Sequence, residues 1–227
     1  MEQEFILLLI TAISLGFLHT LSGPDHYIPF IAFAKAGNWT IKRTAWFTGL
    51  CGIAHIGGAL LIGLAVSNFA PKLPFLHDFA SLRGSFIAWL FISLGVIYMI
   101  KGIKQLFKRK YTKSIQPKPE YQNFQRDQKV RPKRSSIYWI LFIIFLFGPC
   151  EPLIPFLLYP AENINTWAMI TVIGAFGAST VITMQLLVLI PLFGLNRIRL
   201  IRIERYRDFI TGTLIAFCGI GIQFLGL

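Results

Sequence analysis

The sequence predicts an all-α membrane protein: six transmembrane helices arranged as two inverted three-helix repeats, each with a broken first helix. Of the 227 residues, 55% are hydrophobic and only 14% are charged. A water-soluble domain of this size could not keep that much apolar surface away from water. Six apolar segments are long enough to cross a hydrocarbon layer, which takes roughly 20 residues per helix. A Gly-Pro motif also recurs near the start of each half, as expected for an internal repeat.

The six segments divide the chain three and three around a polar stretch. They lie at residues 5–35, 44–68, 83–101, 137–160, 167–194 and 208–227. The first segment is too long, and too polar at its centre, for a cleaved signal peptide, so we interpret it as a permanent span. We therefore expect a first repeat at 1–100, a linker at 101–136 and a second repeat at 137–227.

The basic residues predict the orientation in the membrane. All but two of the 22 Lys and Arg residues fall at 35–43, 101–134 and 197–207. The positive-inside rule places these three regions in the cytoplasm and both termini outside, in a plasma (inner) membrane. The net charge of +12 is thus an orientation signal. We expect the lipid bilayer as a partner and no nucleic acid, and a role of segment 101–135 in binding anionic lipid or a protein stays open.

The segment 101–136 is rich in Lys, Arg, Gln and Pro and reads as a flexible cytoplasmic linker. Three spans on either side of it make the two halves antiparallel. The repeat is visible in residues 23–30 (GPDHYIPF) and 148–156 (GPCEPLIPF). Matching Gly/Pro interruptions in the first helix of each inverted half indicate a binding site near the membrane midplane.

Ionisable residues are rare in the apolar segments. They are His19, Asp25, His26, His55 and Glu151. Such groups are costly at membrane depth, so they face the protein interior and mark a substrate or proton path. We predict that the helix stops at Gly23 and restarts with Pro24 in the first turn of the next helix.

The three histidines and Asp25 predict a metal site. His19 and His26 are seven residues apart and would stand about 10 Å apart on a straight helix, too far to share one ion. Unwinding at the Gly-Pro break would bring them together, and His55 and Asp25 would complete the ligand set. Imidazole and carboxylate ligands suit nickel, cobalt, zinc, iron or copper(II) better than calcium or magnesium. The spacing does not choose among these metals.

Structural interpretations of the same residues stay open. His55 lies among glycines and could serve helix packing. His19, Asp25 and His26 could form a hydrogen-bonded kink. Glu151 could cap a restarted helix or carry a proton for coupling, and Cys150 could be a metal ligand, a redox thiol or a small packing residue. We predict Cys150 and Glu151 as a coupling site or second-half site.

The segment from His19 to His26 (HTLSGPDH) resembles the first-helix signature of the UreH-like membrane proteins, relatives of the nickel/cobalt transporters. Residues 51–55 (CGIAH) resemble the segment that supplies a further histidine in that family. The similarity covers mainly residues 16–63. The resemblance implies transport of nickel or cobalt, with the metal as substrate, no organic cofactor and no enzymatic activity.

The second half is similar to a different group. Residues 148–155 resemble the proline-cysteine helix of the CcdA and DsbD electron carriers, which share the six-helix inverted-repeat plan. This resemblance implies an alternative function, a transmembrane thiol-disulfide relay through Cys150 and Cys51. A third hypothesis is a membrane accessory factor for metalloenzyme assembly, acting with a metalloprotein partner. Homo-oligomerisation is also left open.

Overall fold

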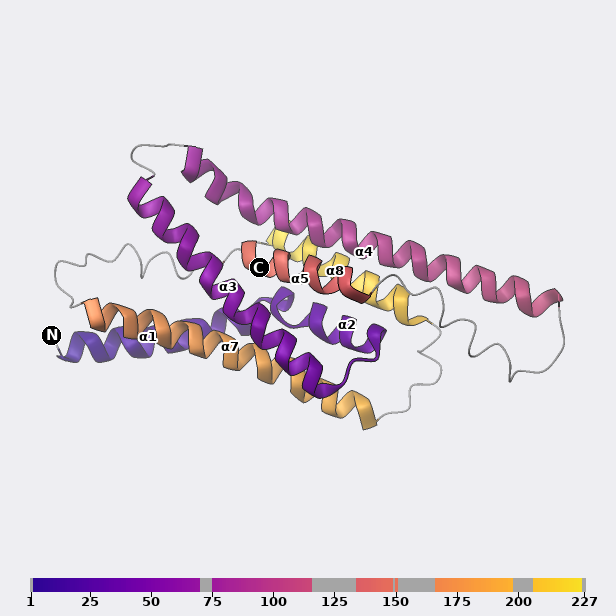
Figure 1. Ribbon diagram of the computed structural model, residues 1–227, viewed down its shortest axis with the longest axis horizontal. Coiled ribbons are helices and arrows are strands. Elements are labelled where there is room, and N and C mark those ends of the chain that lie inside the picture. The colour runs from indigo at the N-terminus through magenta and orange to yellow at the C-terminus, as the bar shows by residue number, and fades with distance from the viewer. Residues whose placement is uncertain are drawn as a thin grey trace.

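The computed structural model describes residues 2–69, 75–115, 134–148, 150, 166–197 and 206–225. In this part of the chain all regular structure is helical, with seven α-helices, one short 3-10 helix and no strand (Figure 1). The elements are α1 (Glu2–Ser22), η1 (Pro24–His26), α2 (Ile28–Gly37), α3 (Ile41–Phe69), α4 (Phe75–Ile115), α5 (Arg134–Phe147), α7 (Thr166–Arg197) and α8 (Arg207–Leu225).

Four of these helices are long and apolar enough to cross a membrane. The apolar stretches are Gln3–Ser22, Ile41–Leu64, Gly84–Phe107 and Trp167–Gly194, and α5 contributes a shorter one, Tyr138–Phe147. Large apolar side chains also cover the outer surface of the bundle: Trp46 on α3 is 76% exposed and Phe224 on α8 is 73% exposed. An apolar outer surface of this extent fits lipid better than water. The prediction of a helical membrane protein is confirmed at this level.

The first predicted segment, 5–35, is interrupted where the sequence indicates. Helix α1 ends at Ser22, Gly23 is extended, and Pro24 opens the short helix η1, from which the chain passes into α2. Proline has no backbone N–H and would clash with the preceding turn of a continuous helix, so the chain has to restart at this point. The predicted break is confirmed.

One boundary differs from the predicted segments, and another can be compared only in part. Helix α4 continues to Ile115, so the first part of the predicted linker 101–136 is helical. Residues 101–115 are mostly strong helix formers, and extending an existing helix is far easier than starting one. In the second half, α5 ends at Phe147, and beyond Cys150 the predicted segment 137–160 lies outside the described residues.

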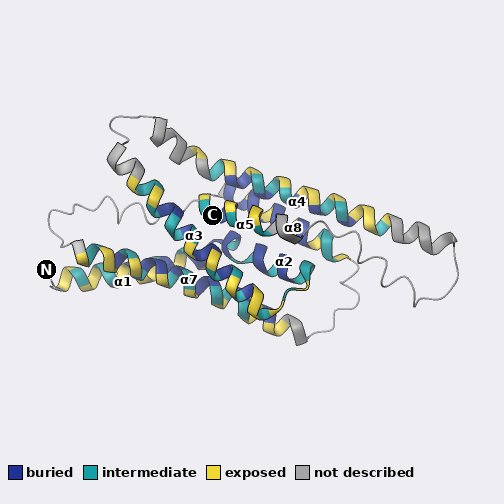
Figure 2. Ribbon diagram, in the orientation of Figure 1, coloured by how far each residue is buried: buried dark blue, intermediate teal, exposed yellow. Residues whose placement is uncertain are grey.

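The helices pack in pairs around a shared interior. α4 lies along α8 and α1 lies along α7, while α3 crosses the bundle and contacts both α5 and α7 (Figure 1). Buried residues line the faces turned toward the interior (Figure 2). The larger apolar cluster includes Phe30, Phe91, Leu141 and Ile215, and a second cluster around Phe176 joins α1, α3 and α7.

Glycines allow α4 and α8 to approach backbone to backbone. Gly95 and Gly102 on α4 are seven residues apart, as are Gly212 and Gly219 on α8, and two helical turns place each pair on one face. A Cβ atom at Gly219 would lie 2.7 Å from the Ala88 carbonyl oxygen, and one at Gly95 would collide with the backbone of Ala216. Small residues at such contacts are typical of helix pairs in membranes.

The substitution Gly95→Ala is expected to destabilise the protein by about 1–3 kcal/mol, because the added methyl group forces the two backbones apart. Thermal unfolding in detergent, followed by circular dichroism, measures the effect. Gly174→Ala is the matched control, since a Cβ atom at Gly174 meets nothing within 4 Å. Equal unfolding temperatures for the two variants would contradict the close α4–α8 contact.

Candidate metal centre

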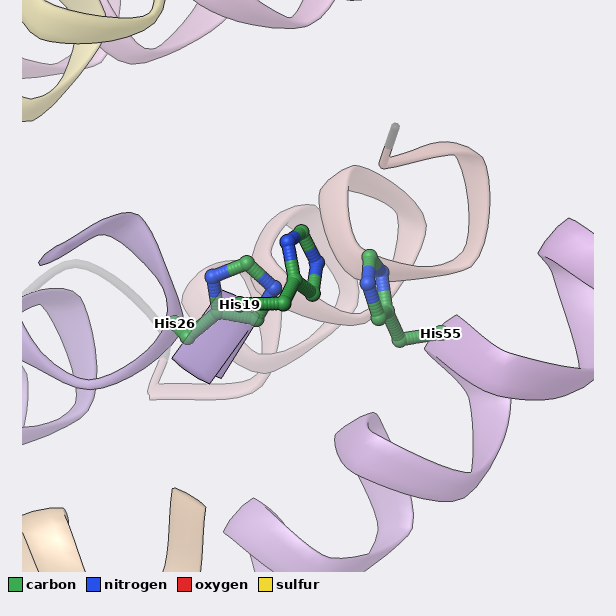
Figure 3. A group of neighbouring side chains, drawn as sticks. All are labelled: His19, His26 and His55. Carbon is green, nitrogen blue, oxygen red and sulfur yellow. The ribbon is translucent and has the colours of Figure 1, made fainter. Parts of the chain in front are cut away.

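Three histidines from separate elements meet inside the helix bundle. His19 lies in the last turn of α1, His26 in η1 and His55 in the middle of α3. Their rings gather in one place (Figure 3), with centroids 4.7 Å apart for His19 and His26 and 5.1 Å apart for His26 and His55. One ligand atom from each residue lies within 4.8 Å of the other two. We refer to these residues as the histidine triad.

The break at Gly23 brings His19 and His26 together. The Gly23 amide donates a hydrogen bond to the His19 carbonyl oxygen over 3.0 Å and so completes the last turn of α1. The chain then turns away, and the His26 ring folds back over the break. A Cβ atom at Gly23 would lie 2.6 Å from His26 Nδ1, so only glycine leaves room for this ring. Gly23 is therefore a steric requirement of the site.

Asp25 and the backbone orient His26. Its Nδ1 atom lies 3.1 Å from Asp25 Oδ1 and 3.2 Å from the Gly23 carbonyl oxygen, and both of these atoms are acceptors. The ring proton therefore belongs on Nδ1, which leaves the lone pair of Nε2 facing the triad. His26 is 2% exposed, and its Nε2 atom has no hydrogen-bond partner. A carboxylate that holds a histidine in this way is a common feature of metal sites.

His55 is oriented from the other half of the chain. Its Nδ1 atom lies 3.1 Å from the carbonyl oxygen of Phe145, in the last turn of α5. The Gly148 amide donates to the same oxygen over 3.2 Å. A Cβ atom at Gly148 would lie 3.0 Å from His55 Nδ1, so glycine is again the residue that fits. The end of α5 thus orients a histidine from the first half of the chain.

The Nε2 atoms of all three histidines are buried and lack a hydrogen-bond partner. Buried polar atoms are nearly always paired, because an unpaired one loses its hydration without replacement. A cation bound between the three nitrogens would satisfy all of them at once. Metal–nitrogen bonds of about 2.0–2.1 Å would draw the nitrogens closer than 4.8 Å, and three ligands leave a fourth position open.

The remaining predicted site residues either do not belong to the group of converging ligand atoms or lie outside the described residues. Asp25 is buried beside the triad, and its Oδ1 atom lies 3.1 Å from His26 Nδ1. Cys150 is 1% exposed and belongs to the second apolar cluster. Glu151 lies outside the described residues. Neither a metal-ligand role nor a coupling role of Cys150 and Glu151 is tested by this arrangement.

Two elements of the site were not singled out from the sequence. One is the carbonyl oxygen of Phe145, a backbone atom that no residue type indicates. Its position three residues before Gly148 could still have suggested it, because a Gly-Pro motif marks a helix end with free carbonyl groups. The second element is the steric role of the two glycines, which depends on how closely the histidine rings approach them.

No family model, no curated protein and no solved structure matches the chain.

Removing the Asp25 carboxylate tests whether it positions a ligand. We expect Asp25→Ala to weaken metal binding about tenfold to hundredfold, since His26 loses its orienting acceptor. His26→Ala is expected to remove high-affinity binding altogether, and Asp208→Ala, at a distant ion pair with Lys101, is the control. Isothermal titration calorimetry with nickel, cobalt and zinc gives the affinities. An Asp25→Ala protein that binds like wild type, or one as impaired as His26→Ala, would contradict a positioning role.

Proposed function

We propose that the protein transports a divalent transition-metal ion across the membrane, with nickel or cobalt as the favoured cargo. One observation carries this proposal: three buried imidazole nitrogens without a protein partner converge at a helix break inside an apolar helix bundle. The metal is the substrate of the protein, and no chemical conversion of it is involved. Neutral imidazoles favour nickel, cobalt, zinc, iron or copper(II), all of which are borderline or soft ions.

The build of the site supports transport rather than permanent metal storage. Structural metal sites in proteins are closed by four protein ligands, whereas sites that exchange a ligand keep one position open. The triad offers three ligands, and they come from two sides of a helix break and from a crossing helix. Small movements between these elements would therefore change the number of ligands and release the ion.

The packing of the helices supports an inverted repeat of six crossings. In the proposed repeat, α1 with α2 corresponds to the segment that begins with α5, α3 corresponds to α7, and α4 corresponds to α8. If the two halves are interchanged in this way, the contact between α1 and α7 becomes the contact between α5 and α3. Both contacts are present. The contact between α4 and α8 maps onto itself. This pattern suits alternating access, in which one repeat rocks against the other around a central site.

The expected topology belongs to the same proposal. With the basic regions in the cytoplasm and the termini outside, the protein would sit in a plasma (inner) membrane and the triad would lie inside the bilayer. Glu151, at the matching break of the second half, is the proposed coupling residue, and Cys150 lies beside it in the proposed second-half site. The thiol-relay alternative has less support, because Cys51 and Cys150 belong to different apolar clusters and all three cysteines are buried thiols.

Uptake of radioactive nickel or cobalt into proteoliposomes tests the proposal. We expect His19→Ala and His55→Ala to reduce uptake to the level of empty liposomes, because each removes one of three ligands. The fourth histidine of the sequence provides a matched variant, His77→Ala, which is expected to transport at the wild-type rate. Cys150→Ser is expected to retain transport as well. Transport that survives loss of the triad, or that disappears only in Cys150→Ser, would contradict the proposal.

A further inference from the structure

A continuous series of aromatic rings leads from the histidine triad to the basic end of α3. The series begins at Phe145, whose ring lies 6.5 Å from His26 and 6.1 Å from His55. Phe30 on α2 follows, with its ring 4.7 Å from that of Phe145. Both side chains are almost completely buried: Phe30 is 0% exposed and Phe145 is 4% exposed. The histidines are therefore closed off on this side by packed hydrocarbon.

The series continues toward the end of the bundle. The Phe47 ring lies 6.1 Å from Phe30 and contacts Trp39 and Tyr138 at 5.7 Å and 5.0 Å. Trp39 and Tyr138 stack on each other, with centroids 4.7 Å apart and planes inclined by 23°. We call the five residues Phe145, Phe30, Phe47, Trp39 and Tyr138 the aromatic column.

A cation lies at the outer end of the aromatic column. The Arg43 guanidinium carbon is 4.6 Å from the centroid of the Tyr138 ring and 6.0 Å from that of Trp39. On α3, Arg43, Phe47, Cys51 and His55 follow one another at four-residue steps, so Arg43 and His55 are about 18 Å apart along the helix axis. Burial increases along this line from exposed Arg43, through half-buried Phe47, to buried Cys51 and His55.

The column is assembled from both halves of the chain. Phe30, Trp39 and Phe47 come from α2, α3 and the turn between them, whereas Tyr138 and Phe145 come from α5. A hydrated cation cannot pass between packed aromatic rings, since an apolar constriction excludes its water. In addition, the positive charge of Arg43 at the outer end repels an approaching metal ion.

We propose that the aromatic column is the closed gate of the histidine triad on the Arg43 side, and that the gate opens when α5 moves away from α2 and α3. This inference rests on the proposed transport function. The same movement would withdraw the Phe145 carbonyl oxygen from His55, since that oxygen belongs to α5. Opening the gate would therefore loosen one ligand of the ion at the moment a path to the Arg43 side appears.

The gate can be tested through Cys51, which lies one turn from Phe47 and one turn from His55 and is 0% exposed. In a Cys150→Ala/Cys218→Ala background Cys51 is the single thiol of the sequence. Inverted membrane vesicles, which expose the basic end, are treated with a cationic, membrane-impermeant methanethiosulfonate reagent. We expect Phe30→Ala and Phe47→Ala to raise the rate of Cys51 modification by about tenfold or more, because thiol reactivity follows access.

The matched control is Phe33→Ala. Phe33 is as large as Phe30, is 2% exposed and lies one turn further along α2, but its ring packs against Tyr98 at 5.2 Å, outside the column. In the Phe33→Ala variant, Cys51 is expected to react at the same rate as in the Cys150→Ala/Cys218→Ala protein. Unchanged modification in both gate variants, or an equal increase in Phe33→Ala, would overturn the proposed gate. Phe47 is only half-buried, so Phe47→Ala keeps the test decisive should Phe30→Ala fail to fold.

Metal titration of the same preparations separates this inference from the proposed function. If Cys51 remains protected in Phe30→Ala and Phe47→Ala while the triad binds metal, the gate proposal fails and the proposed transport function is not contradicted. If the triad binds no metal, the proposed function fails whatever the modification rate of Cys51.

Discussion

A straight helix from residue 5 to residue 35 would hold His19 and His26 about 10 Å apart, and no metal ion could contact both. The interruption at Gly23 removes this constraint by ending α1 and restarting the chain in η1, with the two rings 4.7 Å apart. Proline enforces the interruption, and the missing side chain of glycine makes room for the His26 ring. The geometry of the site therefore depends on these two residues as well as on the histidines.

The second half of the chain supports the site through its backbone. The Phe145 carbonyl oxygen, at the end of α5, accepts hydrogen bonds from His55 and from the Gly148 amide. Two helix ends, one from each half, thus face the same three histidines. Because Phe145 also carries the inner ring of the aromatic column, the same residue orients His55 and forms part of the proposed gate. A movement of α5 relative to α2 and α3 would alter both together.

Much of this arrangement is predictable from the sequence, and the limits have physical causes. The helix break, the approach of His19 to His26, and the contribution of His55 follow from Gly-Pro chemistry and from the scarcity of polar residues in apolar segments. The role of Asp25 was not resolved, because a carboxylate next to a histidine can bind the metal or the imidazole, and only the distances show that it bonds to His26 Nδ1. The hydrogen bond between His55 and Phe145 joins residues 90 positions apart and uses a backbone oxygen, so no residue type in the sequence predicts it. The extent of α4 past residue 101 was missed because charged residues that resemble a linker are also good helix formers.

The most direct test of a three-histidine transition-metal site is X-ray absorption spectroscopy of the purified protein loaded with one equivalent of nickel or cobalt. A single bound ion with a first shell of nitrogen and oxygen, including outer-shell scattering from three imidazoles, is the predicted result. The imidazole signal should fall in His26→Ala. A first shell containing sulfur, or a protein that retains no metal after removal of excess ion, would contradict the central claim.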